Sequence, residues 1–92
     1  MKLKELFTDE SRWTQGVAAR DREGNIVSPN DPLAVKFCPD GGIRRCYPYE
    51  EWSHVRIQLQ HRLHYGQSIT EWNDAPERTF EDIQRLVNEL DI

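Results

Sequence analysis

Residues 31–42 read DPLAVKFCPDGG, and this stretch decides the fold that the sequence predicts. Asp31 is a good helix cap, and Pro32 suits the first helical position, where its missing N–H costs no hydrogen bond. The run that follows is apolar except for one lysine, and a helix that is apolar on nearly every side is usually buried. We therefore expect a central buried helix at residues 32–38, which the Pro-Asp-Gly-Gly sequence at residues 39–42 interrupts.

Two helices with one apolar face are expected to pack on this centre. The spacing of Leu3, Leu6 and Phe7 predicts a short first helix that ends near residues 10–11. The longest polar helix is expected from about Glu50 to His64. Its apolar face carries Trp52, Val55, Leu59 and Leu63, which leaves His54, Gln58 and His61 on another side.

A capping signal begins the last helix at Thr79, because Thr79-x-x-Asp82 is a variant of the capping box. The apolar stripe of this helix comprises Phe80, Ile83, Val87 and Leu90. The preceding residues 69–74 are expected to be extended or turning.

A β-hairpin is expected at about residues 16–28. Asp21 and Gly24 take the first and fourth positions of a type I turn, after which residues 25–27 return the chain. The predicted fold class is therefore α+β, with three to four helices packed around the central helix and one hairpin at its side. Ninety-two residues fit one domain, residues 1–92.

The composition excludes several classes of protein. Apolar residues make up 37% of the chain and charged residues 30%, which is too apolar for a disordered chain and too polar for a membrane protein. No apolar run approaches the ~20 residues of a membrane-spanning helix, and the first residues lack the apolar core of a signal peptide. We therefore expect a cytoplasmic protein with no membrane partner, whose two cysteines are reduced.

The charge distribution argues against a nucleic-acid partner. The formal net charge is −4, and residues 66–92 carry two basic and seven acidic side chains, which would repel phosphates. A weak basic patch is the alternative, and its candidates are Arg44, Arg45, Arg56 and Arg62.

Three short motifs together resemble a known family. They are Trp13-x-Gln15-Gly16, Cys38-x-x-Gly41 and Trp72-Asn73-Asp74-x-x-x-Arg78-Thr79. This pattern resembles that of a family of small uncharacterised bacterial and phage proteins, over roughly residues 12–88. The family usually has an apolar pair after the cysteine and alanine after the first glycine, whereas this chain has Pro39-Asp40 and Gly42. The resemblance implies no activity.

The cysteines and histidines are the first candidates for chemistry. Cys38 could act as a nucleophile with His54, His61 or His64 as its base, but a cysteine in an apolar run is expected to be buried and inert. Zinc is a further alternative, yet Cys38, Cys46, His54 and His61 lack the close Cys pair of structural zinc sites. We expect no catalytic residue, no metal and no cofactor. A disulfide between the cysteines would require the chain to reverse at residues 39–42.

The Trp72-Asn73-Asp74 sequence is the best candidate for ligand binding, because it combines an aromatic ring, an amide and a carboxylate. Arg78 is expected to pair with Asp74, and Trp72 to be buried against the last helix. The alternative is a structural role, since Asn and Asp side chains hydrogen-bond nearby backbone in turns.

Three function classes follow from these observations. The first is a small non-catalytic accessory or protein-interaction protein of bacterial or phage origin, which binds a protein partner or another copy of itself. The second is a small-molecule binder or minor enzyme that uses the Trp72-Asn73-Asp74 region. The third is a weak nucleic-acid binder that uses the four arginines named above.

Overall fold

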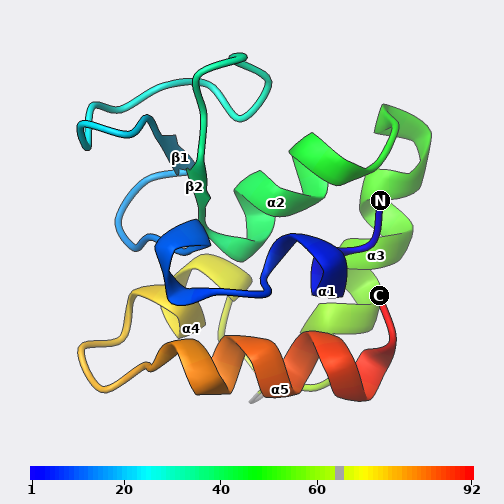
Figure 1. The fold of residues 1–92 in the computed structure, drawn as a ribbon. Coiled ribbons are helices and arrows are strands. Elements are labelled where there is room, and N and C mark those ends of the chain that lie inside the picture. The colour runs from blue at the N-terminus through cyan, green and yellow to red at the C-terminus, as the bar shows by residue number, and fades with distance from the viewer. Residues whose placement is uncertain (64–65) are drawn as a thin grey trace.

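The computed structural model describes residues 1–63 and 66–92, and its fold class is α+β, as predicted (Figure 1). The two strands form a small antiparallel sheet, and the α-helices lie to one side of it and below it in the view of Figure 1. Short 3₁₀-helices are labelled η. The elements of the described residues are, in chain order, α1 (Leu3–Leu6), η1 (Glu10–Arg12), β1 (Ala19–Arg20), β2 (Lys36–Phe37), α2 (Pro39–Cys46), η2 (Tyr49–Glu51), α3 (Trp52–Gln60), α4 (Ile69–Asp74) and α5 (Phe80–Leu90).

The helix expected at residues 32–38 is wrong, because the helix of this region is α2, which begins at Pro39. Cys38 is its N-cap, and the Cys38 Sγ accepts a hydrogen bond of 3.2 Å from the Gly41 N–H. Pro39 takes the first turn, where no N–H donor is needed. The proline therefore starts a helix instead of interrupting one.

Residues 31–37 form a turn and a strand instead. The Asp31 Oδ1 accepts a hydrogen bond of 2.8 Å from the Leu33 N–H, and the Asp31 carbonyl accepts one of 3.0 Å from the Ala34 N–H. An aspartate can satisfy the same N–H donors in a turn as at a helix start, and here it closes the turn. Leu33 is left 66% exposed.

Helix α2 takes the central, buried position that was expected for residues 32–38. Its buried residues are Pro39, Gly41, Gly42 and Ile43, and it packs against α1, α3 and α4. The surrounding core comprises Leu3, Leu6, Phe7, Ala19, Ala34, Phe37, Val55, Leu59, Phe80, Ile83, Val87 and Ile92.

The chain reverses within residues 16–28 as predicted, but the ladder of named strands involves a later segment. Gly24, with φ of 89°, closes the turn by donating a hydrogen bond of 3.1 Å to the Asp21 carbonyl. Arg20 then forms an isolated antiparallel bridge with Ile26. On its other side β1 pairs with β2, in the register Ala19 to Phe37 and Arg20 to Lys36. We call residues 11–37 the strand–loop lobe.

The long polar helix is present, with shorter bounds than predicted. The 3₁₀-helix η2 leads into α3, which ends at Gln60, and the predicted end, His64, lies outside the described residues. Val55 and Leu59 are buried as expected, whereas Leu63 is half-buried beyond the helix end.

The last two helices both begin with a capping box. In α5 the Thr79 hydroxyl accepts a hydrogen bond of 3.3 Å from the Asp82 N–H, and the Asp82 carboxylate accepts one of 3.0 Å from the Thr79 N–H, which confirms the predicted start. Residues 69–74 form the helix α4, so the prediction of an extended or turning segment is wrong. Ser68 and Glu71 supply the missed signal, since they form the same reciprocal cap.

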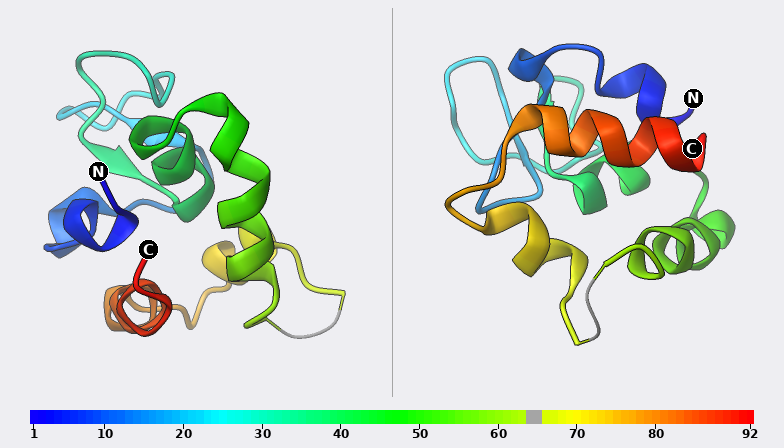
Figure 2. Two further views of the ribbon diagram at one scale, coloured as in Figure 1. Left: turned by 90° about the vertical axis from the view of Figure 1, so that its right-hand side faces the viewer. Right: turned by 90° about the horizontal axis from the view of Figure 1, so that it is seen from below.

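The two ends of the chain lie beside each other (Figure 2). The Lys4 N–H donates a hydrogen bond of 3.0 Å to the Ile92 carbonyl, and both Lys2 and Lys4 form ion pairs with Asp91. Ile92 itself is buried. Within the described residues no helix has both the length and the apolar composition needed to cross a membrane.

Replacing His54 and His61 by alanine is expected to leave the fold intact, because both side chains are exposed. Surface changes of this kind alter the free energy of unfolding by about 0.5 kcal/mol per site. Thermal melting of the double variant checks this, and loss of the folded baseline would show that the rings support the core.

Candidate functional site

The Trp72-Asn73-Asp74 sequence forms the last turn of α4, whose first turn is capped by Ser68 and Glu71. Asn73 is completely buried, Trp72 is half-buried and Asp74 is exposed. The three side chains therefore face different surroundings, although they are neighbours in the sequence.

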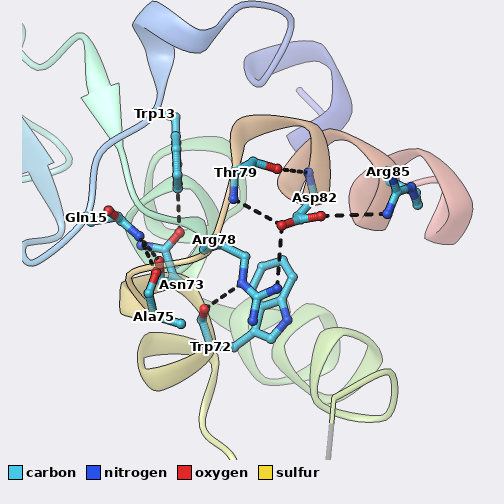
Figure 3. Close-up of polar contacts among 9 residues, drawn as sticks. All are labelled: Trp13, Gln15, Trp72, Asn73, Ala75, Arg78, Thr79, Asp82 and Arg85. Carbon is cyan, nitrogen blue, oxygen red and sulfur yellow. Dashed lines mark hydrogen bonds and ion pairs between the residues drawn. The ribbon is translucent and has the colours of Figure 1, made fainter.

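The Asn73 amide is the centre of a polar network (Figure 3). Its Oδ1 accepts a hydrogen bond of 2.7 Å from the Trp13 Nε1–H. Its Nδ2 donates to the Thr14 carbonyl at 3.1 Å and to the Asp74 Oδ1 at 3.2 Å. Both ends of the amide are thus satisfied inside the protein, as a buried amide requires.

Further hydrogen bonds fasten the same two segments together. The Gln15 Nε2 donates to the carbonyls of Asn73 and Ala75, at 2.6 and 3.1 Å. The Gly16 N–H donates to the Asp74 Oδ1 at 2.9 Å. Residues 13–16 and the end of α4 are therefore joined by a hydrogen bond between two side chains and by several between side chains and backbone groups.

This network favours a structural role for Asn73, because its polar atoms already have partners within the protein. The Trp13 ring also packs against Phe80 of the core, with 6.4 Å between ring centroids. Ligand binding by Trp72, Asn73, Asp74 and Arg78 stays a prediction.

Arg78 packs on Trp72 rather than pairing with Asp74, so the expected ion pair is wrong. The Arg78 guanidinium carbon lies 4.2 Å from the centroid of the Trp72 ring, and the Arg78 Nε–H donates a hydrogen bond of 2.8 Å to the Trp72 carbonyl. The Arg78 guanidinium also forms an ion pair with Asp82, with 3.6 Å between Nη1 and Oδ2 (Figure 3). The two side chains line a cavity of about 230 Å³ with residues of α5.

Replacing Trp72 by alanine is expected to lower the free energy of unfolding by less than it would if the ring were fully buried. The ring is half-buried and covered by Arg78. We expect Trp72→Ala to lower the free energy of unfolding by about 2 kcal/mol, against about 3 to 5 kcal/mol for a buried aromatic ring. Urea denaturation measures the difference, and a loss in the upper range would contradict partial exposure.

Cys38 is held as a helix cap rather than as an activated thiol. Burial raises the pKa of the Cys38 thiol above its ordinary value, although the Gly41 N–H acts in the opposite direction. Cys38 and Asp74 do line one cavity, of about 250 Å³, but Trp72 and Arg78 line the other cavity described above. The structure therefore separates the groups that the enzyme hypothesis would combine.

The other candidates for metal or base chemistry are dispersed. His54 and His61 are exposed, and burial raises the pKa of the half-buried Cys46. Cys38 and Cys46 are both free thiols. His64 lies outside the described residues. In residues 1–63 and 66–92 no three His, Cys, Asp or Glu side chains are grouped to hold a metal ion.

Three of the four arginines proposed for a basic patch are paired with carboxylates. Arg56 donates to both oxygens of Asp40, at 2.6 and 3.1 Å, and Arg44 lies 3.8 Å from the same carboxylate. Arg62 forms an ion pair with Glu89 of α5. These contacts neutralise much of the charge that a nucleic-acid surface would need.

A cavity in the strand–loop lobe was missed at the sequence level. Its volume is about 380 Å³, and it is lined by Ser11, Arg12, Arg22, Val35 and Lys36. These residues come from three separate segments, and no local motif joins them. Only the pairing of β1 with β2 and the turn after β1 bring them together.

Comparison with known proteins identifies one family. The model of a family of unknown function (DUF6197) matches residues 3–90. No curated protein and no solved structure matches the chain.

Proposed function

The chain belongs to this family of unknown function, and from that premise we propose that it is a small non-catalytic protein-interaction protein. The pattern of short motifs resembles bacterial and phage proteins, so the proposed source is bacterial or phage. The proposed location is the cytoplasm, which agrees with two free thiols. The proposed contact surface is the strand–loop lobe.

One observation carries this proposal: within the part of the chain that the structure describes, the outer edge of the lobe at Ile26 is open. The Asp21 N–H donates a hydrogen bond of 2.9 Å to the Asn25 carbonyl, and the Val27 N–H donates one of 3.2 Å to the Ala19 carbonyl. In an antiparallel pair these bonds flank the opposed residues Arg20 and Ile26, whose own N–H and carbonyl groups point away from each other. The backbone groups of Ile26 therefore face outward.

An open edge of this kind accepts another strand. Ile26 is itself 68% exposed, so an apolar residue lies at backbone groups that have no hydrogen bond among the described residues. Extended segments of other proteins add to such edges through main-chain hydrogen bonds and side-chain contacts. The proposed partner is therefore an extended segment of another protein.

The Ile26→Pro variant tests this edge. Proline removes only the outward N–H of residue 26 and keeps the hydrogen bonds that flank the bridge between Arg20 and Ile26. Wild-type protein and the Ile26→Pro and Ile26→Asp variants are immobilised and exposed to lysate of the source cells. Ile57→Asp is the matched control, since Ile57 on α3 is also exposed, at 54%. Melting curves establish that every variant is folded.

The proposal expects one protein that wild type and the control retain and both Ile26 variants lose. With that protein purified, its affinity should fall by about tenfold or more, which corresponds to 1.4 kcal/mol. Equal retention by all variants would overturn the proposal. So would sedimentation showing that Ile26→Pro dissociates a dimer of this chain, because the occupant would then be a second copy.

A further inference from the structure

The lysine and arginine side chains divide into two groups. Among the described residues, seven form ion pairs with carboxylates: Lys2, Lys4, Arg44, Arg56, Arg62, Arg78 and Arg85. The five without such a pair are Arg12, Arg20, Arg22, Lys36 and Arg45. Four of these five belong to the strand–loop lobe, and Arg45 contacts it.

Two of the five brace the backbone of the lobe. Arg20 donates to the Thr14 hydroxyl at 2.9 Å and to the Gly24 carbonyl at 3.0 Å. Arg45 donates to the carbonyls of Pro29 and Asp31, at 2.9 and 2.8 Å. These contacts occupy both guanidinium groups with neutral acceptors.

The remaining three cations, Arg12, Arg22 and Lys36, line the same 380 Å³ cavity. Within the described part of the chain, their side chains have neither an ion pair nor a hydrogen bond. The Arg12 guanidinium is nevertheless positioned, since its carbon lies 6.0 Å from the centroid of the Phe37 ring. Three convergent cations without a counter-charge make a site for anions.

The aspartates that neighbour these cations in the sequence are directed to other donors. Asp9 accepts hydrogen bonds from the Ser11 N–H and hydroxyl, which lower the pKa of its carboxyl. Asp21 accepts from the backbone N–H groups of Glu23 and Asn25, at 3.0 and 2.8 Å. Each carboxylate is thus held in a local turn and leaves the cations of the cavity unpaired.

One residue of the cavity, Lys36, presents its side chain to the same face of the sheet as Ile26 at the open edge. Residues directly opposed across a ladder present their side chains to one face, so Ile26, Arg20 and Lys36 share a face. At about 4.8 Å per strand, Ile26 and Lys36 lie about 10 Å apart. One protein partner can therefore cover both features.

We infer that the cavity binds carboxylate side chains of an acidic segment in the partner, an inference that rests on the proposed function. The arginine fork matches a carboxylate, and Val35 offers an apolar wall to the methylene groups of a glutamate or aspartate. Ile26, which is exposed and shares a face of the sheet with Lys36, also suits a peptide.

The test uses an oligo-glutamate peptide as the probe, with an oligo-glutamine peptide of equal length as its control. Amide chemical shifts of the labelled protein report binding at residues 11, 12, 22, 35 and 36. The variant Arg12→Gln, Arg22→Gln, Lys36→Gln removes the cavity cations. The matched control, Lys2→Gln, Arg62→Gln, Arg85→Gln, removes the same charge from ion-paired surface sites. Because Arg12 contacts Phe37, Arg22→Gln alone is measured as well.

The inference expects shifts with oligo-glutamate and none with oligo-glutamine. The affinity should fall about tenfold or more in the triple variant, which corresponds to 1.4 kcal/mol, fall measurably in Arg22→Gln, and stay unchanged in the control. Equal binding of the peptide by the triple and control variants would overturn the inference about the cavity. The proposed function would remain supported in that case if Ile26→Pro still lost the protein partner. Displacement of the peptide by inorganic phosphate or a single-stranded oligonucleotide at lower concentration would also overturn it.

Discussion

Gly41→Ala is expected to lower the free energy of unfolding by about 3 kcal/mol, although alanine is the better helix former by up to about 1 kcal/mol. A Cβ at this position would lie 2.0 Å from the Ala18 carbonyl oxygen and 2.8 Å from its carbon. That carbonyl accepts a hydrogen bond of 3.1 Å from the Cys38 N–H. The clash is therefore with backbone that is itself held in place.

The neighbouring glycine is the matched control. A Cβ at Gly42 would meet side-chain atoms of Leu3, Phe7 and Leu6, at 2.9, 3.2 and 3.3 Å. Side chains can turn aside, and the gain in helix propensity offsets part of the strain, so Gly42→Ala should stay within about 1 kcal/mol of wild type. Melting curves should separate the two variants by roughly 10 °C or more. Equal melting temperatures would show that α2 does not approach Ala18 closely.

Asn73→Ala is the second substitution with a large expected effect, again about 3 kcal/mol. It leaves the Trp13 Nε1–H and the Thr14 carbonyl without their partners, and each buried polar group left unsatisfied costs about 1 to 3 kcal/mol. Asn30→Ala is the control, since that exposed side chain makes no hydrogen bond among the described residues. Urea denaturation with the tryptophan signal measures both.

Asn73→Asp adds a test with a defined pH dependence. The ionised carboxylate would face the Thr14 carbonyl and Asp74, which raises the pKa of the new group. A raised pKa in the folded state means that stability relative to wild type is gained as the pH falls and lost as it rises. A difference from wild type that is constant with pH would contradict the burial of this side chain beside the Thr14 carbonyl and Asp74.

Local signals predicted the helices whose determinants are local. The apolar stripe and the Thr79 cap placed α5 correctly, and the face of Val55 and Leu59 placed α3. The Ser68 and Glu71 cap of α4 was present in the sequence and was overlooked.

The wrong helix at residues 32–38 has a different cause. Two prolines seven residues apart, Pro32 and Pro39, both follow residues that can cap a helix. Local capping preferences favour Asp31 over Cys38 and so select the wrong proline. The choice depends on the close approach of Gly41 to Ala18, which is a contact between distant segments.

The site features share this dependence on distant contacts. The network of Asn73 joins residues about sixty positions apart, and the cavity of Arg12, Arg22 and Lys36 joins three segments. The aromatic ring, amide and carboxylate of the Trp72-Asn73-Asp74 sequence predicted a ligand site. Only the fold shows that the amide is buried and that Arg78 covers the tryptophan ring.

The contact between Lys4 and Ile92 has a topological consequence. Since the amide of one end already meets the carbonyl of the other, a short peptide linker from Ile92 to Met1 would join the backbone into a ring without moving a helix. Ring closure restricts the unfolded chain and so favours the folded one. The ring could then be opened between the exposed Pro76 and Glu77. Such a circular permutant would place α5 first in the chain and keep every neighbour that it has in the fold.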